Sequence, residues 1–248
     1  MIIYGINPVL EALRAGRVTE LRVADRGGER IRDVLALAAD RGVRVQRVPA
    51  DVLTRQARGG VHQGVVAETS EVPEYSIADL VHGARGVPLI VVLDGIEDPH
   101  NVGAILRTAD AAGVDGVVIQ QRRSASLDGA AAKASAGAVA HVRIAQVVNI
   151  ARALEELKDA GIWTVGLAAE SGTRYDEVDL TVPAAIVVGA EGTGLRRLVR
   201  EKCDFLAAIP MSGHVASLNV SVAAGITLFE AVRQRRDAGG QGILGREV

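Results

Sequence analysis

The segment LIVVLDGIEDPHNVGAILRTA, residues 89–109, decides the fold class. It begins with a continuous apolar run, Leu89–Leu93, which is typical of a strand buried on both faces of a parallel sheet. A polar turn follows, and apolar residues with helical spacing run from Asn101 to Ala112, where Gly113 ends the pattern. A buried strand that leads into a helix predicts an α/β fold with a parallel sheet.

The same alternation continues through residues 87–236, which we expect to form the larger of two domains. The pattern predicts further strands at 116–119, 139–144, 162–167, 184–188 and 206–209, and helices at 130–136, 149–160 and 219–236. Residues 237–248 contain several glycines, which predict a flexible tail.

Residues 1–70 predict a smaller α/β domain. Asn7 and Pro8 favour the start of a helix, with Asn7 as its cap, and Asp51 is expected to cap a later helix. Further strands are expected at 21–24, 43–48 and 64–68, and a helix at 29–41. Residues 71–86 are predicted to be a polar linker that contains a short helix capped by Ser76.

The composition limits the possible functions. The chain has 248 residues and a formal net charge of -2, so it lacks the strongly basic balance of a non-specific nucleic-acid binder. Aromatic residues make up 2%, which argues against a base-stacking platform. Residues 1–72 carry 11 arginines and no lysine against 9 acidic residues. This arginine-rich unit suits contact with phosphate, although a solvated charged surface is the simpler explanation of the charge alone.

The single cysteine, Cys203, rules out a disulfide within the chain and a CxxC zinc pair, and it fits a reducing compartment. The apolar run at the N-terminus is too short for a signal peptide, and no window reaches the roughly 18 apolar residues of a membrane span. We therefore expect a soluble, cytoplasmic protein that needs no metal ion and does not contact a membrane.

Two further segments join the end of an apolar strand to a polar loop. Residues 187–195, VVGAEGTGL, place three glycines after a strand, with a spacing that fits neither a P-loop nor a GxGxxG fingerprint. Residues 209–223, IPMSGHVASLNVSVA, lead from a strand to a helix that Ser217 or Asn219 can cap. Ligands of open α/β sheets bind outside the carboxyl ends of the strands, so we expect these segments to form one site.

The three segments, in this order, resemble the three motifs of the SpoU/TrmH branch of the SPOUT RNA 2′-O-methyltransferases. The first matches N-x-G-x-x-x-R-[S/T]-A, the second G-x-E-G-x-G, and the third I-P-M followed by S-L-N-V-S. The matching residues are Asn101, Gly103, Arg107, Thr108 and Ala109; Gly189, Glu191, Gly192 and Gly194; Ile209, Pro210, Met211, Ser217, Leu218, Asn219, Val220 and Ser221. The segments 4–9, YGINPV, and 62–64, HQG, resemble the RlmB-type subgroup, which carries an N-terminal RNA-binding domain related to a ribosomal protein.

The resemblance implies a C-terminal parallel-sheet domain tied in a trefoil knot, a homodimer whose active sites are completed across the interface, and S-adenosylmethionine as the cofactor. Knots are rare exceptions in protein folds, so periodicity could not have suggested one. By this resemblance Gly189, Ile209 and Leu218 line the cofactor site, with Met211, Gly194 and Leu167 as neighbours.

The resemblance also implies catalytic roles. The family assigns deprotonation of the ribose hydroxyl to the first motif's arginine, here Arg107. Arginine is a poor base, so Arg107 either becomes a base through its surroundings or stabilises the developing oxyanion and positions a phosphate. Asn101 is expected to hold Arg107 or the ribose, and Glu191 to orient the substrate or a catalytic side chain. Ser217 and Asn219 are expected to shape the pocket. His100 adjoins the first motif but is not part of it, and we interpret it as a bystander.

The expected function is methylation of a ribose 2′-hydroxyl, most specifically a guanosine in the peptidyl-transferase P loop of 23S rRNA, free or in an assembly intermediate. Three alternatives stay open: another rRNA site of the antibiotic-resistance type, tRNA, or a non-catalytic RNA-binding factor in ribosome assembly. A nucleotide-dependent oxidoreductase is disfavoured, because the glycine loop comes late in the chain and lacks the expected spacing.

Overall fold

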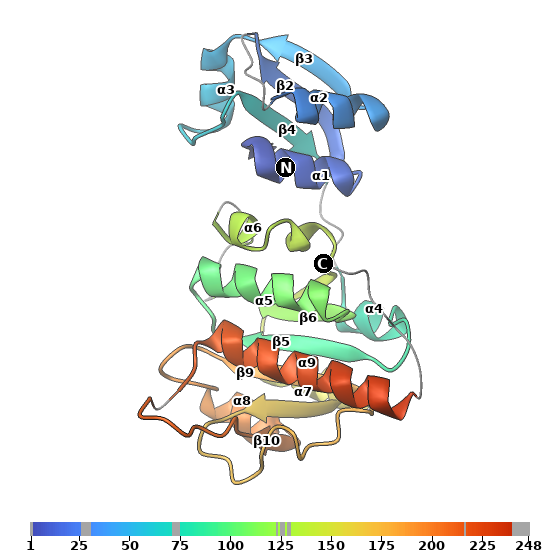
Figure 1. The fold of residues 1–248 in the computed structure, drawn as a ribbon, viewed down its shortest axis with the longest axis vertical. Coiled ribbons are helices and arrows are strands. Elements are labelled where there is room, and N and C mark those ends of the chain that lie inside the picture. Colours follow the sequence, from blue (N-terminus) through green and yellow to red (C-terminus); the bar gives the residue numbers. More distant parts are fainter. Residues whose placement is uncertain are drawn as a thin grey trace. The chain divides into compact units, whose positions relative to one another are not determined.

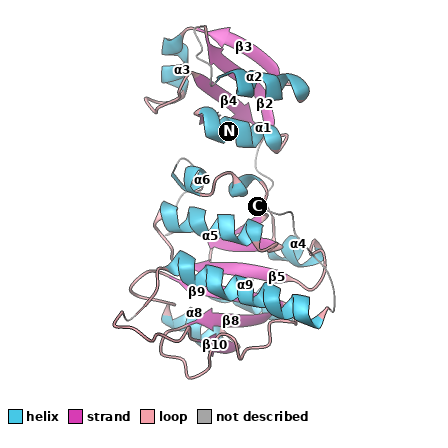
Figure 2. Ribbon diagram, viewed as in Figure 1, coloured by secondary structure: helices cyan, strands magenta, loops and turns pink. Residues whose placement is uncertain are grey.

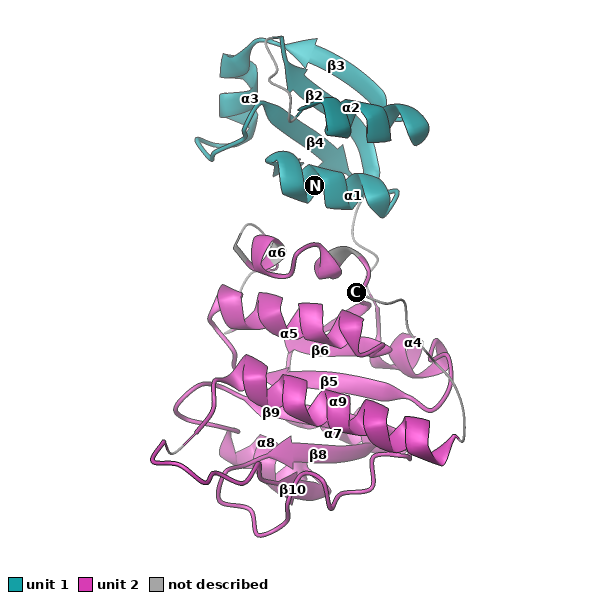
Figure 3. Ribbon diagram, in the orientation of Figure 1, with its two compact units in different colours: residues 1–73 teal, residues 74–248 magenta. Residues whose placement is uncertain are grey.

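The computed structural model describes residues 2–25, 31–70, 75–122, 124, 127, 130–215 and 217–239. The chain divides into two compact units, Met1–Pro73 and Glu74–Val248, which Figure 3 shows in different colours. Both contain helices and strands, as Figure 2 shows, and the predicted α/β class with a parallel sheet is confirmed. The C-terminal part of the predicted tail, 240–248, lies outside the described residues.

The first unit is a four-stranded sheet in the order β1-β4-β2-β3, in which β2 and β3 are parallel and β4 runs antiparallel to β1 and β2. Val9, Leu13, Leu21 and Val34 belong to the core between the sheet and its helices. The strands are β1 (Ile2–Tyr4), β2 (Val18–Ala24), β3 (Arg44–Val48) and β4 (Val65–Thr69), and the helices are α1 (Ile6–Arg14), α2 (Ile31–Asp40) and α3 (Ala50–Gln56).

Two capping predictions in this unit were wrong. Helix α1 begins at Ile6 with Gly5 as its N-cap, so Asn7 lies inside the first turn. Helix α3 begins after Pro49, which places Asp51 in its first turn. In both cases the chain enters the helix one or two residues early, and the polar side chain sits where it can interact with the positive end of the helix dipole instead of capping it. Strand β1 was not predicted, because three residues are too few to show a period.

The second unit contains a six-stranded parallel sheet in the order β10-β8-β9-β5-β6-β7. The late strand β9 lies between β5 and β8, so the loop that follows it emerges beside the loop after β5. The strands are β5 (Leu89–Asp94), β6 (Gly116–Gln120), β7 (Ile144–Val147), β8 (Trp163–Leu167), β9 (Ala184–Gly189) and β10 (Phe205–Ala207).

Helices cover both faces of this sheet, as Figure 1 shows. Helices α5 (Pro99–Ala111) and α9 (Val220–Ala238) pack on one face against Leu89, Val91 and Leu93. Helices α4 (Ile77–His82), α7 (Ile150–Asp159) and α8 (Arg197–Lys202) pack on the other face, which carries Ile90 and Val92. Alternate residues of β5 enter the cores on opposite faces of the sheet, which is why the strand is apolar at consecutive positions.

The short elements differ most from the sequence-based expectation. A strand was predicted at 139–144, but Ala138–Ala140 form a 3-10 turn after Gly137, whose φ of 97° turns the chain, and β7 starts only at Ile144. Helix α8 was not predicted, because it is rich in charge and only Val199 among its residues is buried. Helix α4, with its predicted cap Ser76, lies in the segment assigned to the linker but packs Ile77 and Leu80 into the second unit.

Gly103 explains how α6 (Ala130–Ala134) approaches α5 so closely. A Cβ atom at Gly103 would lie 2.5 Å from the Cβ of Ala134 and 2.7 Å from the carbonyl oxygen of Ala131. The backbone of α6 therefore lies where a side chain at residue 103 would have to be. A glycine inside a helix costs stability, and here that cost is offset by close helix packing.

Arg235 connects the end of α9 to two other segments of the second unit. Its guanidinium donates hydrogen bonds to the carbonyl oxygens of Val87 (2.6 Å), Pro88 (2.9 Å), Leu180 (2.8 Å) and Val182 (2.9 Å). These carbonyls belong to the segments that lead into β5 and β9, the two central strands. One side chain therefore connects the last helix to the segments that precede both central strands.

We predict that Arg235→Ala lowers the free energy of unfolding of the second unit by about 2–4 kcal/mol, because four carbonyl oxygens, three of them in part-buried contacts, lose their hydrogen-bond donor. Arg236→Ala is the matched control: Arg236 is exposed, and its one ion pair among the described residues joins its Nε to Oδ1 of Asp237 at 3.7 Å. Its effect should stay within about 0.5 kcal/mol. Urea unfolding followed by the fluorescence of Trp163, the single tryptophan, measures both variants. Equal stability of the two variants would show that the hydrogen bonds of Arg235 do not stabilise the second unit.

Candidate active site

Three segments far apart in sequence are joined by one chain of side-chain hydrogen bonds. The amide nitrogen of Asn101 donates to the carboxylate of Glu191 at 3.2 Å. The amide nitrogen of Asn219 donates to the amide oxygen of Asn101 at 2.9 Å. The amide oxygen of Asn219 in turn accepts from the backbone N–H of Ser221 at 2.9 Å, as the N-cap of α9. The first turn of α5, the loop after β9 and the start of α9 therefore meet at one point.

The central member of this chain is Asn101, which is 6% exposed. Asp98 caps α5 by accepting from the N–H of His100 at 2.8 Å, so Asn101 lies in the first turn and not at the start of the helix. Both functional atoms of its amide are used, one as donor and one as acceptor, so its orientation is determined. Asn101 was expected to hold Arg107 or the ribose; within one chain its side chain bonds to Glu191 and Asn219.

A cavity of about 280 Å³ lies beside Glu191, between the loops after β8, β9 and β10. Apolar side chains and glycine backbone form most of its wall, and Ser217 and Glu191 also line it. All six residues that the sequence assigned to the cofactor lie in this wall: Leu167, Gly189, Gly194, Ile209, Met211 and Leu218. A concave apolar pocket with a few polar groups is the form that small-molecule sites take.

Gly189 sets the shape of this cavity. A Cβ atom there would lie 2.2 Å from the carbonyl carbon of Gly194 and 2.3 Å from the backbone nitrogen of Leu195. The loop also closes on itself, because Ala190 and Gly194 exchange two backbone hydrogen bonds of 3.1 and 2.8 Å. The loop after β9 therefore folds back on its own strand and exposes backbone groups to the cavity, which any side chain at residue 189 would prevent.

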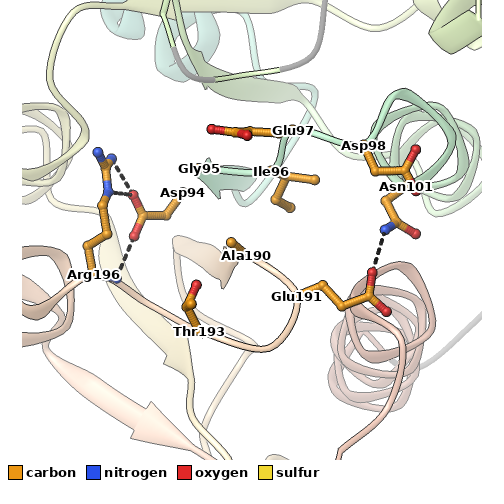
Figure 4. A pocket seen from close by; sticks show the side chains of 10 residues that line it. All are labelled: Asp94, Gly95, Ile96, Glu97, Asp98, Asn101, Ala190, Glu191, Thr193 and Arg196. Atoms are coloured by element: carbon orange, nitrogen blue, oxygen red, sulfur yellow. Dashed lines mark hydrogen bonds and ion pairs between the residues drawn. The ribbon is translucent and has the colours of Figure 1, made fainter.

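A second cavity, of about 380 Å³, adjoins the first and is drawn in Figure 4. It lies between the loop that links β5 to α5 and the loop after β9, and Ala190, Glu191 and Thr193 line both cavities. Figure 4 shows the bond between Asn101 and Glu191 at one end and the pair of Asp94 and Arg196 at the other. The loop after β9 is therefore a wall shared by two neighbouring pockets.

Two ion pairs at these pockets were missed by the sequence reasoning. Asp94, the last residue of β5, is completely buried and pairs with Arg196. Glu170 and Arg200, which both line the smaller cavity, also form an ion pair. An acidic residue that ends an apolar strand was a usable signal for Asp94. No sequence pattern shows which of several arginines near α8 would reach it.

The structure places Arg107 away from the other predicted catalytic residues. It lies on the exposed side of α5, and within the described part of the chain it makes no hydrogen bond or ion pair. It follows Asn101 by six positions, which corresponds to about 9 Å along the helix and a turn of about 120°. The cluster in one chain thus contains Asn101, Glu191 and Asn219 beside the cavity wall with Ser217, but not Arg107.

The thiol of Cys203 is not suited to catalysis. Burial raises the pKa of Cys203 to about 12, and the thiol donates a hydrogen bond of 3.3 Å to the carbonyl of Val199. The thiolate is the nucleophilic form, so this cysteine stays inert near neutral pH. Among the residues described, no group of three or more His, Cys, Asp and Glu side chains could hold a metal ion. No helix in that same part of the chain is long and apolar enough to span a membrane.

Comparison with known families agrees with this arrangement. Residues 88–229 match the model of the SpoU rRNA Methylase family, and residues 2–75 match the RNA 2'-O ribose methyltransferase substrate binding model. The chain belongs to the SpoU rRNA methylase family. It is therefore a methyltransferase of RNA ribose 2′-hydroxyls that uses S-adenosylmethionine, as the motif resemblance implied.

Relatives of this SpoU-family enzyme cover both units. The 23S rRNA (guanosine-2'-O-)-methyltransferase RlmB of Pseudomonas aeruginosa is 45% identical over 94% of this chain and 96% of its own. The SpoU methyltransferase AviRb of Streptomyces viridochromogenes, solved with AdoMet, has a TM-score of 0.77 at 27% identity and covers 96% of this chain and 91% of its own. A TrmH/SpoU tRNA modifying enzyme of A. aeolicus has a TM-score of 0.57 at 36% identity and covers 66% of this chain and 84% of its own.

We predict that Gly189→Ala abolishes cofactor binding, because the added Cβ would collide with backbone atoms that cannot rotate away. The dissociation constant for S-adenosylhomocysteine, measured by isothermal titration calorimetry, should rise at least about a hundredfold, as expected for a loop displaced by about 1 Å. Gly172→Ala is the control, since nothing lies within 4 Å of a Cβ at that position. Wild-type affinity in Gly189→Ala would show that the loop after β9 does not form the cofactor site.

Proposed function

We propose that this enzyme methylates the ribose 2′-hydroxyl of a guanosine in the peptidyl-transferase P loop of 23S rRNA. The observation that carries the proposal is the hydrogen-bond chain of Glu191, Asn101 and Asn219 beside the glycine-walled cavity. The likeness to RlmB supports the target, since it extends over 94% of the chain and includes the unit that matches the substrate-binding model. The guanosine target is the activity named for that relative.

We propose that the cofactor occupies the smaller cavity. Its wall fits the group: Leu167, Ile209, Met211 and Leu218 offer apolar surface for an adenine ring and a thioether chain. Gly189 and Gly194 leave backbone groups accessible for hydrogen bonds to the polar parts. When bound, the cofactor supplies an electrophilic methyl group on a positively charged sulfur. The larger adjoining cavity, which shares Glu191 with the first, is then the place where the target ribose reaches the methyl group.

The side chains have separate tasks in this proposal. Asn101 is held by two partners, so it fixes one oxygen of the Glu191 carboxylate and leaves the other available to orient the ribose. Ser217 shapes the cavity wall, and Asn219 fixes Asn101. Arg107 lowers the energy of the oxyanion that develops on the attacking 2′-oxygen and positions the neighbouring phosphate. We favour this role over a base, because a guanidinium gives up its proton with difficulty. The proton of the 2′-hydroxyl then leaves to solvent water as the oxygen takes up the methyl group.

We propose that the first unit binds the RNA substrate. It carries 11 of the chain's arginines within residues 1–72, and arginine pairs with phosphate through two parallel donors. These contacts would position the RNA without reading its sequence, and the pocket in the second unit would then select the nucleotide. We also propose a cytoplasmic location, where ribosomal RNA and assembly intermediates are found.

We propose that the enzyme acts as a homodimer formed through the face of α5 and α9. Val222 and Phe229, seven residues apart on α9, are 48% and 51% exposed, and they lie on one stripe of the helix. Arg107 is exposed on the neighbouring helix α5. A second copy on this face would cover the apolar stripe and enclose Arg107, which a single chain leaves outside its own cluster of catalytic side chains.

We predict that Phe229→Asp produces a monomer, because it places a charge in that apolar stripe. The other phenylalanine, Phe205, is 46% exposed at the edge strand β10, so Phe205→Asp is the matched control and should stay dimeric. Sedimentation velocity at micromolar concentration distinguishes the two. A wild-type enzyme that sediments as a monomer, or a Phe229→Asp variant that stays dimeric, would reject this interface.

Methyl transfer tests the activity. We predict that wild-type enzyme incorporates radiolabel from S-adenosylmethionine at one P-loop guanosine ribose of 23S rRNA or of an assembly intermediate. Arg107→Ala should reduce kcat at least about a hundredfold, the usual loss when a group that stabilises an oxyanion is removed. Its affinity for S-adenosylhomocysteine should be unchanged, because Arg107 does not line the cofactor cavity.

His100→Ala is the control for this experiment, since His100 is exposed next to the cluster and, among the described residues, its side chain makes no hydrogen bond or ion pair. It should keep kcat within about threefold of wild type. Labelling of tRNA alone, or of a different rRNA position, would overturn the proposed target. Undiminished kcat in Arg107→Ala would remove Arg107 from the mechanism.

A further inference from the structure

The buried carboxylate of Asp94 is used entirely by one partner. Its Oδ2 accepts the backbone N–H of Arg196 at 2.8 Å, and its Oδ1 accepts the Nε–H of the same residue at 2.7 Å. The Nη2 of Arg196 completes an ion pair with Oδ1. Asp94 therefore binds both the main chain and the side chain of Arg196, at the point where the loop after β9 ends and α8 begins.

The same contact extends across the carboxyl edge of the sheet. The Nη2 of Arg196 donates to the side-chain oxygen of Gln120, at the end of β6, at 2.9 Å. The side-chain nitrogen of Gln120 donates to the carbonyl of Val148, just after β7, at 3.1 Å. The guanidinium of Arg196 therefore connects the ends of β5 and β6 to the loop after β9.

Asp94 stands directly opposite Gly189 in the pairing of β5 with β9. The loop leaves the sheet at Gly189, closes between Ala190 and Gly194, and returns to the sheet where Asp94 accepts the N–H of Arg196. At its other end the loop carries Glu191, which is bound by Asn101. The loop is thus held by two contacts, both with the β5–α5 segment.

We propose that Asp94 and Arg196 are positioning residues that hold the loop of residues 189–195 in the conformation that cofactor binding and methyl transfer both require. Only the Asp94 side of this ion pair is buried, since the Arg196 side chain is 42% exposed. Such a pair adds little to stability compared with apolar residues of equal size, so its value here lies in fixing one geometry. The loop forms a wall of both cavities, so a shift of its end would move the cofactor wall and Glu191 together. Neither Asp94 nor Arg196 is part of the smaller, cofactor-binding cavity itself.

The test compares two adjacent arginines. Arg196→Gln removes the guanidinium that holds Asp94. Arg197→Gln instead removes an exposed arginine whose one ion pair among the described residues is with Glu201 along α8, at 2.7 Å. We expect Arg196→Gln to raise the dissociation constant for S-adenosylhomocysteine about tenfold and to lower kcat at saturating S-adenosylmethionine by about ten- to a hundredfold. Arg197→Gln should change each quantity less than about twofold.

Both quantities are measured on protein shown to be folded, at a temperature well below the melting temperature of each variant. A purely structural role would lower the melting temperature of Arg196→Gln and leave its dissociation constant and kcat at wild-type values, and that result would overturn the proposal. A double-mutant cycle with Asp94→Asn should show that the second substitution adds little, because the two residues act as one unit.

If Arg196→Gln does not fold, Arg196→Lys replaces it, since lysine keeps the buried charge balanced but lacks the forked donors. Wild-type affinity and kcat in Arg196→Lys would also overturn the proposal. The inference rests on the proposed cofactor site. Binding measurements on the wild-type protein distinguish a failure of that site from a failure of the positioning role. Failure of the wild type to bind S-adenosylhomocysteine rejects that site, whereas normal wild-type binding with unaffected variants rejects only the role of Asp94 and Arg196.

Discussion

The parallel pairing of β5 with β9 is the contact on which the rest of the second unit depends. In this register Asp94 lies opposite Gly189, so the ends of the two strands, and the loops that follow them, emerge side by side. The side chains that meet at the site lie shortly after the ends of these two strands. Asn101 follows the first strand by seven residues, and Glu191 follows the second by two, and their hydrogen bond closes the gap between them. A shift of one residue in the register would separate these partners and place each side chain on the wrong face.

The pairing is possible because both strands are buried on both faces. Their residues are apolar throughout, apart from Asp94 at the end and Gly189 opposite it. Helices α5 and α9 cover one face and α4, α7 and α8 the other, so water is excluded from both. In such surroundings a carboxylate such as Asp94 is acceptable only with a complete set of partners, and Arg196 supplies it. The core therefore limits how the loop after β9 can return to the sheet.

That loop is held by two polar contacts, one near each of its ends. At one end Arg196 meets Asp94 beside the core, and at the other Glu191 meets Asn101 at the larger cavity. Between them, the backbone of Gly189–Leu195 forms a wall of the smaller cavity. This arrangement is consistent with a site that is formed before its ligands arrive, in which little ordering has to accompany binding.

The sequence by itself determined the α/β class, the parallel sheet, the cap of α4 at Ser76 and the family, because these depend on local periodicity and on short motifs. It also named the six residues that the structure gathers in the smaller cavity, through resemblance to motifs and not through spacing. The structure alone decided that Asn101 bonds Glu191 and Asn219 rather than Arg107, and that Arg196 reaches Asp94 while Arg197 does not. It also decided that residues 139–144 divide between a 3-10 turn and a strand. The reason is physical: these contacts join residues up to 118 positions apart, and their partners are chosen by strand order and register, which no local pattern contains.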